Sequence, residues 1–158
     1  MTVTIRRAGP DDIESIIAVG RRTWPTTYGF AGPGYITHGL ETWWSAEAIR
    51  RSLANTTVLV AEDDGAVVGT GNIDVRGECP VIWKLYVVPE AQGAGIGSAL
   101  IRELFDHAGG RPVRLEYIDG NTSAASFYAA HGFVEIRREA NERAGWPDAV
   151  WVERPFSK

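Results

Sequence analysis

The feature that most constrains the fold is a glycine-rich segment, Gln92-Gly93-Ala94-Gly95-Ile96-Gly97, which follows an apolar run. That run, residues 81–88, is rich in β-branched and aromatic residues and predicts a buried strand. After the segment, Ile96, Leu100 and Leu104 recur at helical spacing. Amides at the start of a helix lack intrahelical partners and lie at the positive end of its dipole. Because glycines place no side chain in the way, the segment predicts a cradle for an anion.

Three interpretations of this loop compete. A P-loop requires a Gly-Lys-Ser/Thr ending, and the loop contains no lysine. A dinucleotide-binding loop requires Gly-x-Gly-x-x-Gly, but the third glycine here, Gly97, comes one residue early after Gly93 and Gly95. A plain glycine-rich turn that packs closely on its neighbours explains the loop equally well when the loop is taken alone.

The first third of the chain predicts one strand and two helices. Residues 3–5 alternate apolar and polar side chains, as a strand does. A helix is expected over residues 10–24, because proline and acidic residues suit its first turn and Pro25 disfavours its continuation. Residues 25–40 contain four glycines and are expected to be irregular or a broken helix. Ser45 is a suitable N-cap for a further helix.

The middle of the chain predicts an antiparallel meander. Strands are expected at residues 58–61, 66–75 and 81–88, separated by turns at Asp63-Asp64-Gly65 and Gly77-Glu78. Consecutive strands joined by short turns pair antiparallel. The chain therefore reaches the glycine loop from a meander, whereas a dinucleotide fold places this loop early in a parallel sheet.

The last third of the chain predicts a crossover and two closing strands. The helix after the loop ends at Gly109-Gly110, and residues 113–117 alternate as a strand. This strand follows a helical crossover, so we expect it to run parallel to the strand before the loop. A helix over 121–131 and strands near 133–139 and 148–156 complete the chain. The pattern predicts an α/β fold with a mixed sheet.

Length and composition favour a single domain over residues 1–158. Apolar residues make up 44% of the chain and charged residues 23%, which is ordinary for a globular protein. The net charge of −4 argues against a nucleic-acid partner, which would require a basic face. A mildly acidic chain suits a cationic acceptor molecule, although acidity also serves solubility alone.

The sequence contains no signal for a membrane, a disulfide or a metal. No stretch reaches the roughly 18 apolar residues of a membrane-spanning helix, and the N-terminus lacks the apolar core of a signal peptide. We therefore expect a cytoplasmic protein without a membrane partner. Cys79 is the only cysteine, so no disulfide can form within the chain. His38, His107 and His131 show no metal-ligand spacing, so no metal is expected.

The glycine loop and its flanks, residues 89–100, resemble the acetyl-CoA signature of the GNAT acetyltransferase superfamily. That signature has glutamine or arginine, two residues, glycine, one residue, and then glycine or alanine. Gln92, Gly95 and Gly97 match it. The preceding residues 85–89 also resemble the strand end of that family.

A second resemblance lies downstream, in the order that the family shows. The family pattern Asn-x-x-Ala-x-x-Phe-Tyr-x-x-x-Gly-Phe is matched by Asn121, Ala124, Phe127, Tyr128, Gly132 and Phe133. Taken singly, these residues have simpler explanations: the phenylalanines as core, the glycine as a helix C-cap, the asparagine as an N-cap. Two ordered motifs, within an element order that covers nearly the whole chain, indicate the family.

The resemblance implies the GNAT fold, with a mixed sheet of about seven strands, about four helices, and fourth and fifth strands that splay apart. It also implies acetyl-CoA as the acyl donor, with the loop amides on the pyrophosphate, Gln92 ordering the turn, and the fourth strand and Asn121 on the pantetheine. The implied cofactor-binding residues are Leu85, Tyr86, Val87, Gln92, Gly93, Ala94, Gly95, Ile96, Gly97, Ser98, Asn121, Ala124, Phe127 and Tyr128.

Transfer of an acyl group to an amine requires a neutral amine, a stabilised oxyanion and protonation of the leaving thiolate. By resemblance, Tyr128 is the general acid, and a phenol that stays protonated at neutral pH suits that task. The base is open, because the fourth strand has no carboxylate and its Lys84 is expected to be a solvated lysine at a sheet edge. Glu116 is the weak catalytic candidate beside Asp74, Glu78 and a chain of water molecules; Cys79 is not expected to act as a nucleophile.

The acceptor is expected to be a small-molecule or peptide amine. Aromatic residues in the segments that set acceptor specificity in such folds suit a cation–π pocket, but also suit a core or a dimer face, so a homodimer is one expectation. They are Trp24, Tyr28, Phe30, Tyr35, Trp43, Trp44, Trp146 and Trp151. The stretch from Trp24 to Trp44 faintly resembles polyamine or small-amine acetyltransferases. The alternative function is a catalytically silent acyl-CoA-binding sensor or regulatory domain.

Overall fold

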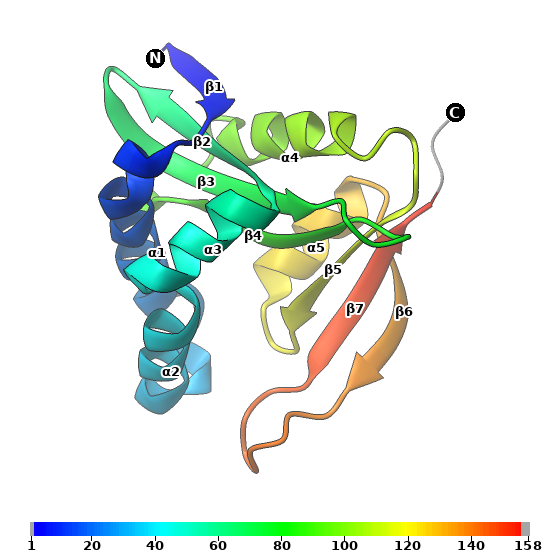
Figure 1. Cartoon of the computed structure of the whole chain (residues 1–158). Helices are drawn as coiled ribbons and strands as arrows, with labels where there is room; N and C mark the ends of the chain where they lie inside the picture. The colour runs from blue at the N-terminus through cyan, green and yellow to red at the C-terminus, as the bar shows by residue number, and fades with distance from the viewer. Residues whose placement is uncertain (1, 156–158) are drawn as a thin grey trace.

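The computed structural model describes residues 2–155, which form one mixed sheet with helices on both faces (Figure 1). The strands are β1 Val3–Arg7, β2 Thr57–Asp63, β3 Ala66–Asp74, β4 Val81–Val87, β5 Val113–Ile118, β6 Val134–Glu139 and β7 Ala149–Arg154. The α-helices are α1 Ile13–Thr27, α2 Pro33–Trp43, α3 Ala46–Asn55, α4 Ile96–Asp106 and α5 Thr122–Ala130.

The sheet has seven strands in the spatial order β1-β2-β3-β4-β5-β7-β6. All neighbours pair antiparallel except β4 and β5, which are parallel. The expected meander of β2, β3 and β4 is confirmed, as is the parallel pairing after the crossover through α4. Within the described residues there are five α-helices, where the sequence predicted about four.

The additional helix is α2, in a stretch that the sequence predicts to be irregular or a broken helix. Pro33 occupies its first turn, where a missing backbone N–H costs nothing. Tyr35 is buried and stacks on the ring of Trp24, with 5.7 Å between centroids. Gly39 is buried against the same ring. Burial of one helix face therefore outweighs the low helix propensity of the glycines.

The expected end of α1 before Pro25 is also wrong, since the helix continues through this proline to Thr27. Pro25 lies in the last turn, where the missing N–H removes one hydrogen bond near a helix end that frays in any case. The preceding residue, Trp24, is 3% exposed and belongs to the core between α1, α2 and α3. That packing holds the turn in place.

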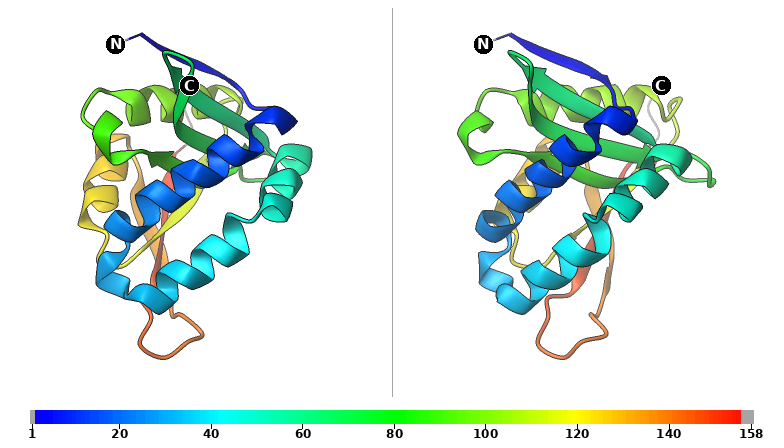
Figure 2. Two further views of the ribbon diagram at one scale, coloured as in Figure 1. Left: turned by 90° about the vertical axis from the view of Figure 1, so that its left-hand side faces the viewer. Right: turned by 60° about the vertical axis from the view of Figure 1, so that its left-hand side comes forward.

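The sheet lies between α1, α2 and α3 on one side and α4 on the other (Figure 2). Two clusters of buried hydrophobic residues fill the molecule. On one face, α4 buries Leu100, Ile101 and Leu104 completely against the strands. On the other face, α1, α2 and α3 bury a second cluster, and this cluster is unusually aromatic. It comprises Ile16, Ile17, Trp24, Tyr28, Tyr35, Trp44, Ile49, Val58 and Val60. No helix among residues 2–155 is long and apolar enough to span a membrane.

The parallel pair β4–β5 opens almost as soon as it forms. Its register contains the pairs Val81↔Arg114 and Ile82↔Leu115, and beyond them the two strands are not paired. The register between β3 and β4 shifts at the same place, so that Trp83 has no partner across the ladder. A bulge of this kind bends its strand and increases the local twist. From Lys84 to Val87 the β5 side of β4 is free, as the predicted splay requires.

Two glycines allow the aromatic core to close. A Cβ at Gly20 would fall within the ring of Trp44, and a Cβ at Gly39 would fall within the ring of Trp24. Both tryptophans are almost fully buried, so a displaced ring would disturb the packing around it. The close approach of α1, α2 and the α2–α3 junction depends on these two positions.

We predict that Gly39→Ala lowers the free energy of unfolding by about 1–3 kcal/mol, because the added methyl group overpacks the core against Trp24. Gly29→Ala is the control, since a Cβ at that exposed position meets nothing within 4 Å. Urea unfolding of both variants measures the difference. Equal stability of the two variants would contradict the close packing of α2 on Trp24.

Candidate active site

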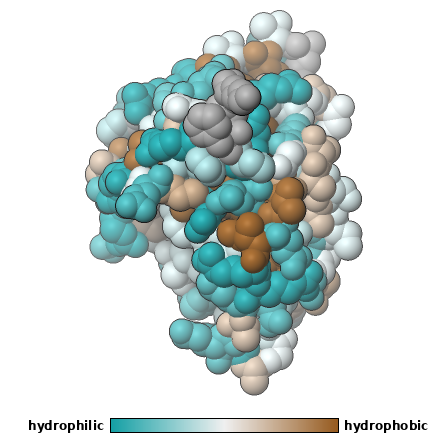
Figure 3. Space-filling view, turned by 90° about the vertical axis from the view of Figure 1, so that its right-hand side faces the viewer, coloured by the Kyte–Doolittle hydropathy of each residue, from teal (hydrophilic) through white to brown (hydrophobic). Residues whose placement is uncertain are grey.

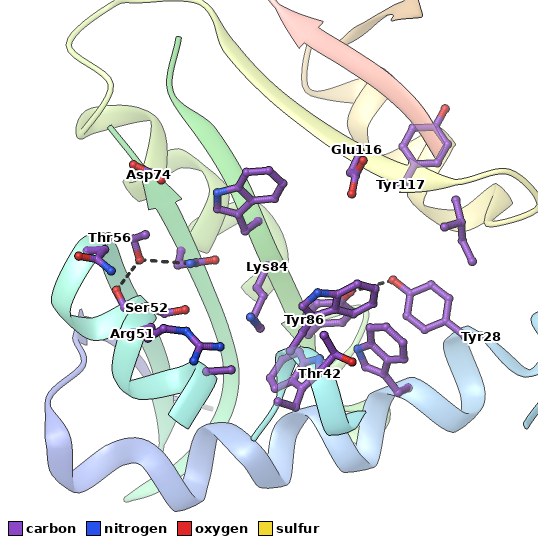
Figure 4. A pocket seen from close by; sticks show the side chains of 18 of the residues that line it. Tyr28, Thr42, Arg51, Ser52, Thr56, Asp74, Lys84, Tyr86, Glu116 and Tyr117 are labelled. Atoms are coloured by element: carbon purple, nitrogen blue, oxygen red, sulfur yellow. Dashed lines mark hydrogen bonds between the residues drawn. The ribbon is translucent and has the colours of Figure 1, made fainter. Parts of the chain in front are cut away.

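Two cavities of about 450 Å³ each meet where β4 and β5 separate. The first, the loop cavity, lies between β4, the glycine loop and α5, and is bounded by residues such as Val87, Gly95 and Phe127. The second, the aromatic cavity, lies between the sheet and the helices α2 and α3, and is bounded by residues such as Trp43 and Ser52 (Figure 4).

The backbone of the glycine loop, which borders the loop cavity, has donor groups without partners in the helix. Gly93 and Gly95 have φ angles of 85° and 81°, a region that favours glycine, and a Cβ at either position would meet nothing within 4 Å. The amide of Ala99 donates to the Gly95 carbonyl at 3.0 Å, so the amides before it have no carbonyl of the preceding turn to bond. The Gln92 side chain donates to the Val87 carbonyl at 2.9 Å and ties the loop to the end of β4.

The structure brings together nearly all of the predicted cofactor-binding residues. Ala94 is the exception, since it belongs to the loop but does not line the cavity. The predicted residues that line the loop cavity are Leu85, Tyr86, Val87, Gln92, Gly93, Gly95, Ile96, Gly97, Ser98, Asn121, Ala124, Phe127 and Tyr128.

Two side chains of this set already have partners within the chain. The carboxamide oxygen of Asn121 accepts from the Ala124 amide at 3.2 Å and caps α5, which leaves its NH₂ group for a ligand. The hydroxyl of Ser98 lies 3.1 Å from Nε2 of His131. The sequence did not suggest a contact between Ser98 and His131, because the two residues lie on different elements, α4 and the end of α5.

Tyr128 lies on α5 with its ring held by other aromatic residues. It stacks on Tyr117 with 6.1 Å between centroids and meets Phe127 and Phe133 at steep angles. Burial raises the pKa of the Tyr128 phenol above its ordinary value, and the nearby Tyr28 adds to the effect. Within residues 2–155 its hydroxyl has no hydrogen-bond partner. Tyr128 therefore presents a protonated phenol to the loop cavity.

The two cavities share a wall, which we call the junction. The residues that line both cavities are Tyr28, Trp83, Lys84, Tyr86, Glu116 and Tyr117. The hydroxyl groups of Tyr28 and Tyr86 lie 2.8 Å apart and link α1 to β4. Molecules bound in the two cavities would meet at the junction, so any reaction between them would take place there.

The aromatic residues divide between the two roles that the sequence left open. Trp24, Tyr28, Tyr35 and Trp44 are core residues on one side and walls of the aromatic cavity on the other. Trp43 is more exposed and lines the same cavity. The remaining three lie outside it: Phe30 is exposed, Trp146 packs on Tyr35, and Trp151 packs on Trp83.

Of the three carboxylates considered as bases, Glu116 alone lies at the junction. Partial desolvation, with a smaller effect from Glu139, raises the pKa of the Glu116 carboxyl group. Asp74 lines the aromatic cavity, but Arg76 hydrogen-bonds to it at 2.8 Å and lowers its pKa. Glu78 is exposed and lines neither cavity.

The interpretation of Lys84 as a solvated lysine at a sheet edge is wrong. Strand β4 is central, and after the bulge at Trp83 the Lys84 side chain points to the face that α1, α2 and α3 cover. Its Nζ lies 5.2 Å from the centroid of the Trp44 ring. Burial lowers the pKa of the Lys84 ammonium to about 8. The sequence signal was weak, because the bulge reverses which side of the strand faces the helices.

Neither a metal site nor a reactive cysteine accompanies the cavities. Among residues 2–155, no three His, Cys, Asp or Glu side chains are grouped so that they could hold a metal ion. Cys79 lies outside both cavities, its thiol donates to the Pro112 carbonyl at 3.3 Å, and burial raises its pKa.

Comparison with known proteins identifies the family. A family model described as an acetyltransferase (GNAT) domain matches residues 54–135. The N-alpha-acetyltransferase RimI of Mycobacterium tuberculosis is 33% identical over 118 residues, which cover 70% of this chain and 75% of that protein. The spermidine N(1)-acetyltransferase of Thermoplasma acidophilum is 29% identical over 143 residues, which cover 84% of this chain and 89% of that protein.

The solved structures agree. The crystal structure of PaiA N-acetyltransferase from Thermoplasma acidophilum, in complex with coenzyme A, has the same fold with a TM-score of 0.85 at 23% identity. The match covers 99% of this chain and 100% of that one. The chain belongs to the GNAT acetyltransferase family, and its class of activity is acetyl-CoA-dependent N-acetyl transfer. The resemblance found in the two motifs is thereby confirmed.

The loop cavity fits the donor of this family. Loop amides without intrahelical partners suit a pyrophosphate, and the open space above Gly93 and Gly95 is what an anion on the backbone needs. The free edge of β4 suits an extended amide-containing arm.

We predict that Gly95→Ala raises the Kd for acetyl-CoA at least about tenfold, because the methyl group enters the cradle and disfavours the left-handed backbone. Gly65→Ala is a matched control, since Gly65 has a φ of 83° and open space around it, in the β2–β3 turn outside the loop cavity. Each variant should lose about 1–2 kcal/mol of stability from backbone strain. Calorimetric titration compares them, and an equal change in Kd for both would contradict the assignment of the loop.

Proposed function

We propose that the protein transfers the acetyl group of acetyl-CoA to a primary amine by direct attack at the junction, with Tyr128 as the general acid. The observation that carries this proposal is the meeting of the loop cavity and the aromatic cavity between the splayed ends of β4 and β5. One cavity has the features of a donor site, and the other opens to solvent on the opposite side of the sheet.

The chain positions the donor through its backbone. Amides from Gly93 to Ser98 bind the pyrophosphate, and Gln92 holds the loop in register with β4 through its bond to Val87. The free edge of β4 at Leu85, Tyr86 and Val87 pairs with the pantetheine arm as an added strand would. A backbone N–H of this edge polarises the thioester carbonyl, and Asn121 bonds the arm from the opposite wall.

Acetyl-CoA supplies an acyl group activated as a thioester. The acceptor nitrogen forms a bond to the acyl carbon, and the carbon–sulfur bond breaks. Tyr128 gives its phenolic proton to the departing sulfur, and the proton that the nitrogen loses goes to a base at the junction. Because burial raises its pKa, Tyr128 is fully protonated at neutral pH before each turnover.

The base is Glu116 or a chain of water molecules. Glu116 lines both cavities, and its raised pKa makes it a stronger proton acceptor than a carboxylate with the ordinary pKa. Its side chain is exposed, which also allows water to pass the proton to solvent. The pH dependence of the reaction separates these two routes.

The acceptor is a small-molecule or peptide amine. Two relatives indicate the range: one is named an N-alpha-acetyltransferase and the other a spermidine N(1)-acetyltransferase. The aromatic cavity, of about 450 Å³, is large enough for a small amine or for the first residues of a peptide.

A homodimer is part of the proposal, through the edge strand β6. Every residue of β6 is exposed, and Val134 and Ile136 are its exposed large apolar side chains, at 62% and 41%. Figure 3 views the molecule from this side and shows a small apolar patch within a mostly polar surface. Light scattering of the purified chain would detect a dimer, and a monomer at all concentrations would contradict it.

We predict that Tyr128→Phe lowers kcat by about 10²-fold or more, because general acid catalysis typically contributes that much. The Kd for acetyl-CoA should change little, since the ring that packs on Tyr117 is retained. Thiol release measures kcat, and calorimetry measures the Kd. An unchanged kcat would remove Tyr128 from this role. Tight binding of acetyl-CoA by the wild type without turnover on any amine would instead indicate a silent sensor.

We predict that Glu116→Gln changes the slope of log(kcat/KM) against pH. The amine must lose a proton before it reacts, which gives the plot a slope of one at low pH. A carboxylate base must also be deprotonated, so below the pKa of that base the slope rises to two. Since the pKa of Glu116 is raised, the wild type should reach a slope of two at a pH above the ordinary glutamate range. The variant should keep a slope of one throughout. Identical profiles would favour the water chain.

A further inference from the structure

Lys84 places an unpaired ammonium in the wall between the two cavities. It lines both of them, and its Nζ lies near the Trp44 ring at the base of the aromatic cavity. Within residues 2–155 it makes neither a side-chain hydrogen bond nor a salt bridge. Its pKa of about 8 is set by burial, so the group is still mostly cationic at neutral pH. Burial of an unpaired charge is costly, and a ligand of opposite charge offsets that cost.

The neighbouring charges do not supply this partner. Asp74 is bound to Arg76 at 2.8 Å. Glu116 rises from β5 on a different wall of the aromatic cavity, as Figure 4 shows, and forms no salt bridge within the described residues. The cavity thus contains one unpaired cation and one unpaired anion that face the same space.

Asn72 is a further polar residue in the wall of the aromatic cavity. It is 3% exposed and lies opposite Lys84 across the β3–β4 ladder. Its NH₂ group donates to the Thr56 hydroxyl at 3.1 Å, and Thr56 in turn donates to the Ser52 carbonyl at 2.7 Å. These bonds fix the orientation of the amide. The Asn72 carbonyl oxygen is buried from solvent and has no partner among the described residues.

We infer that the acceptor is a zwitterionic amino acid, whose carboxylate pairs with Lys84 while its amine faces Glu116 and the thioester. This inference rests on the proposed acetyl transfer. Because Lys84 lines the junction itself, the negative group must be close to the reacting nitrogen, as it is in an α-amino acid. The side chain then lies among the aromatic walls formed by Trp24, Tyr35 and Trp43.

Other amines fit this site less well. A polyamine would bring a second ammonium toward Lys84, and like charges at close range repel each other. The N-terminal residue of a peptide has a neutral amide where the amino acid has its carboxylate, so it leaves the Lys84 charge unpaired. The positions of Lys84 and Glu116 therefore select for charge pattern as well as for size.

The test compares amino acids with their own primary amides, in which only the carboxylate is replaced by a neutral group. L-phenylalanine, L-leucine and L-methionine, each with its amide, and spermidine are assayed by thiol release. We expect kcat/KM for the accepted acids to exceed that for the amides by about 10- to 100-fold, as one charge-assisted pair provides. The amine of an amide is the less basic one and thus more often neutral, so this comparison works against the inference.

Two variants assign the preference to one residue. Lys84→Met keeps the length of the side chain and should reduce the preference to less than about threefold, by raising KM for the acids while the amides change little. Arg50→Met removes a positive charge from an exposed position of α3 that lines neither cavity, and should keep the wild-type preference. Thermal melts check that both variants fold. If Lys84→Met does not fold, Lys84→Arg, which retains the charge, takes its place.

Each result supports or overturns the inference. If kcat/KM for the amides or for spermidine equals that for the acids, the inference is overturned, while the proposed acetyl transfer is not affected. An equal fall of kcat for acids and amides in Lys84→Met would also overturn it, because Lys84 would then act in proton transfer. If no amine is acetylated, the proposed function fails. The inference is then tested by calorimetry, in which amino acids are titrated into the CoA-loaded protein. Binding of an amino acid that depends on Lys84 supports the inference, and absence of such binding overturns it.

Discussion

The bulge at Trp83 is the constraint on which the site depends. It shifts the register between β3 and β4 by one residue, at the point where the pairing of β4 with β5 stops after two residue pairs. Without it, a continuous ladder would use the backbone groups of β4 that the proposed mechanism assigns to the donor. The same shift turns Lys84 toward the helices instead of toward the α4 core. One local irregularity thus lies at the opening and turns the Lys84 charge toward it.

The same aromatic side chains pack the core and line the aromatic cavity. Trp24 and Trp44 close the core under α2 and also form walls of the aromatic cavity. Gly20 and Gly39 permit this arrangement, since any side chain there would displace a ring. A cavity with walls that belong to a packed core is rigid, and a rigid wall holds an acceptor in a constant position relative to the thioester. Stability and specificity are therefore coupled in this half of the molecule.

Much of the fold could be predicted from the sequence, because short-range patterns determine it. The meander, the crossover and the glycine loop follow from alternation, turn residues and helical periodicity. For α2 the sequence predicted only an irregular segment or a broken helix, since the tolerance of Gly39 depends on its contact with Trp24 of α1. Lys84 was misjudged for a related reason: a bulge depends on the pairing of two strands and reverses the expected face. Contacts between distant segments decide both cases.

The central claim is that the donor lies along the free edge of β4 with its phosphates on the glycine loop. Hydrogen–deuterium exchange of the whole chain, with and without acetyl-CoA, tests it directly. The account predicts slower exchange at residues 84–87, 93–98 and 121–124, with no change in β6. Protection of the loop alone, with the amides of β4 unaffected, would contradict it, because the splayed strand would then have no part in binding.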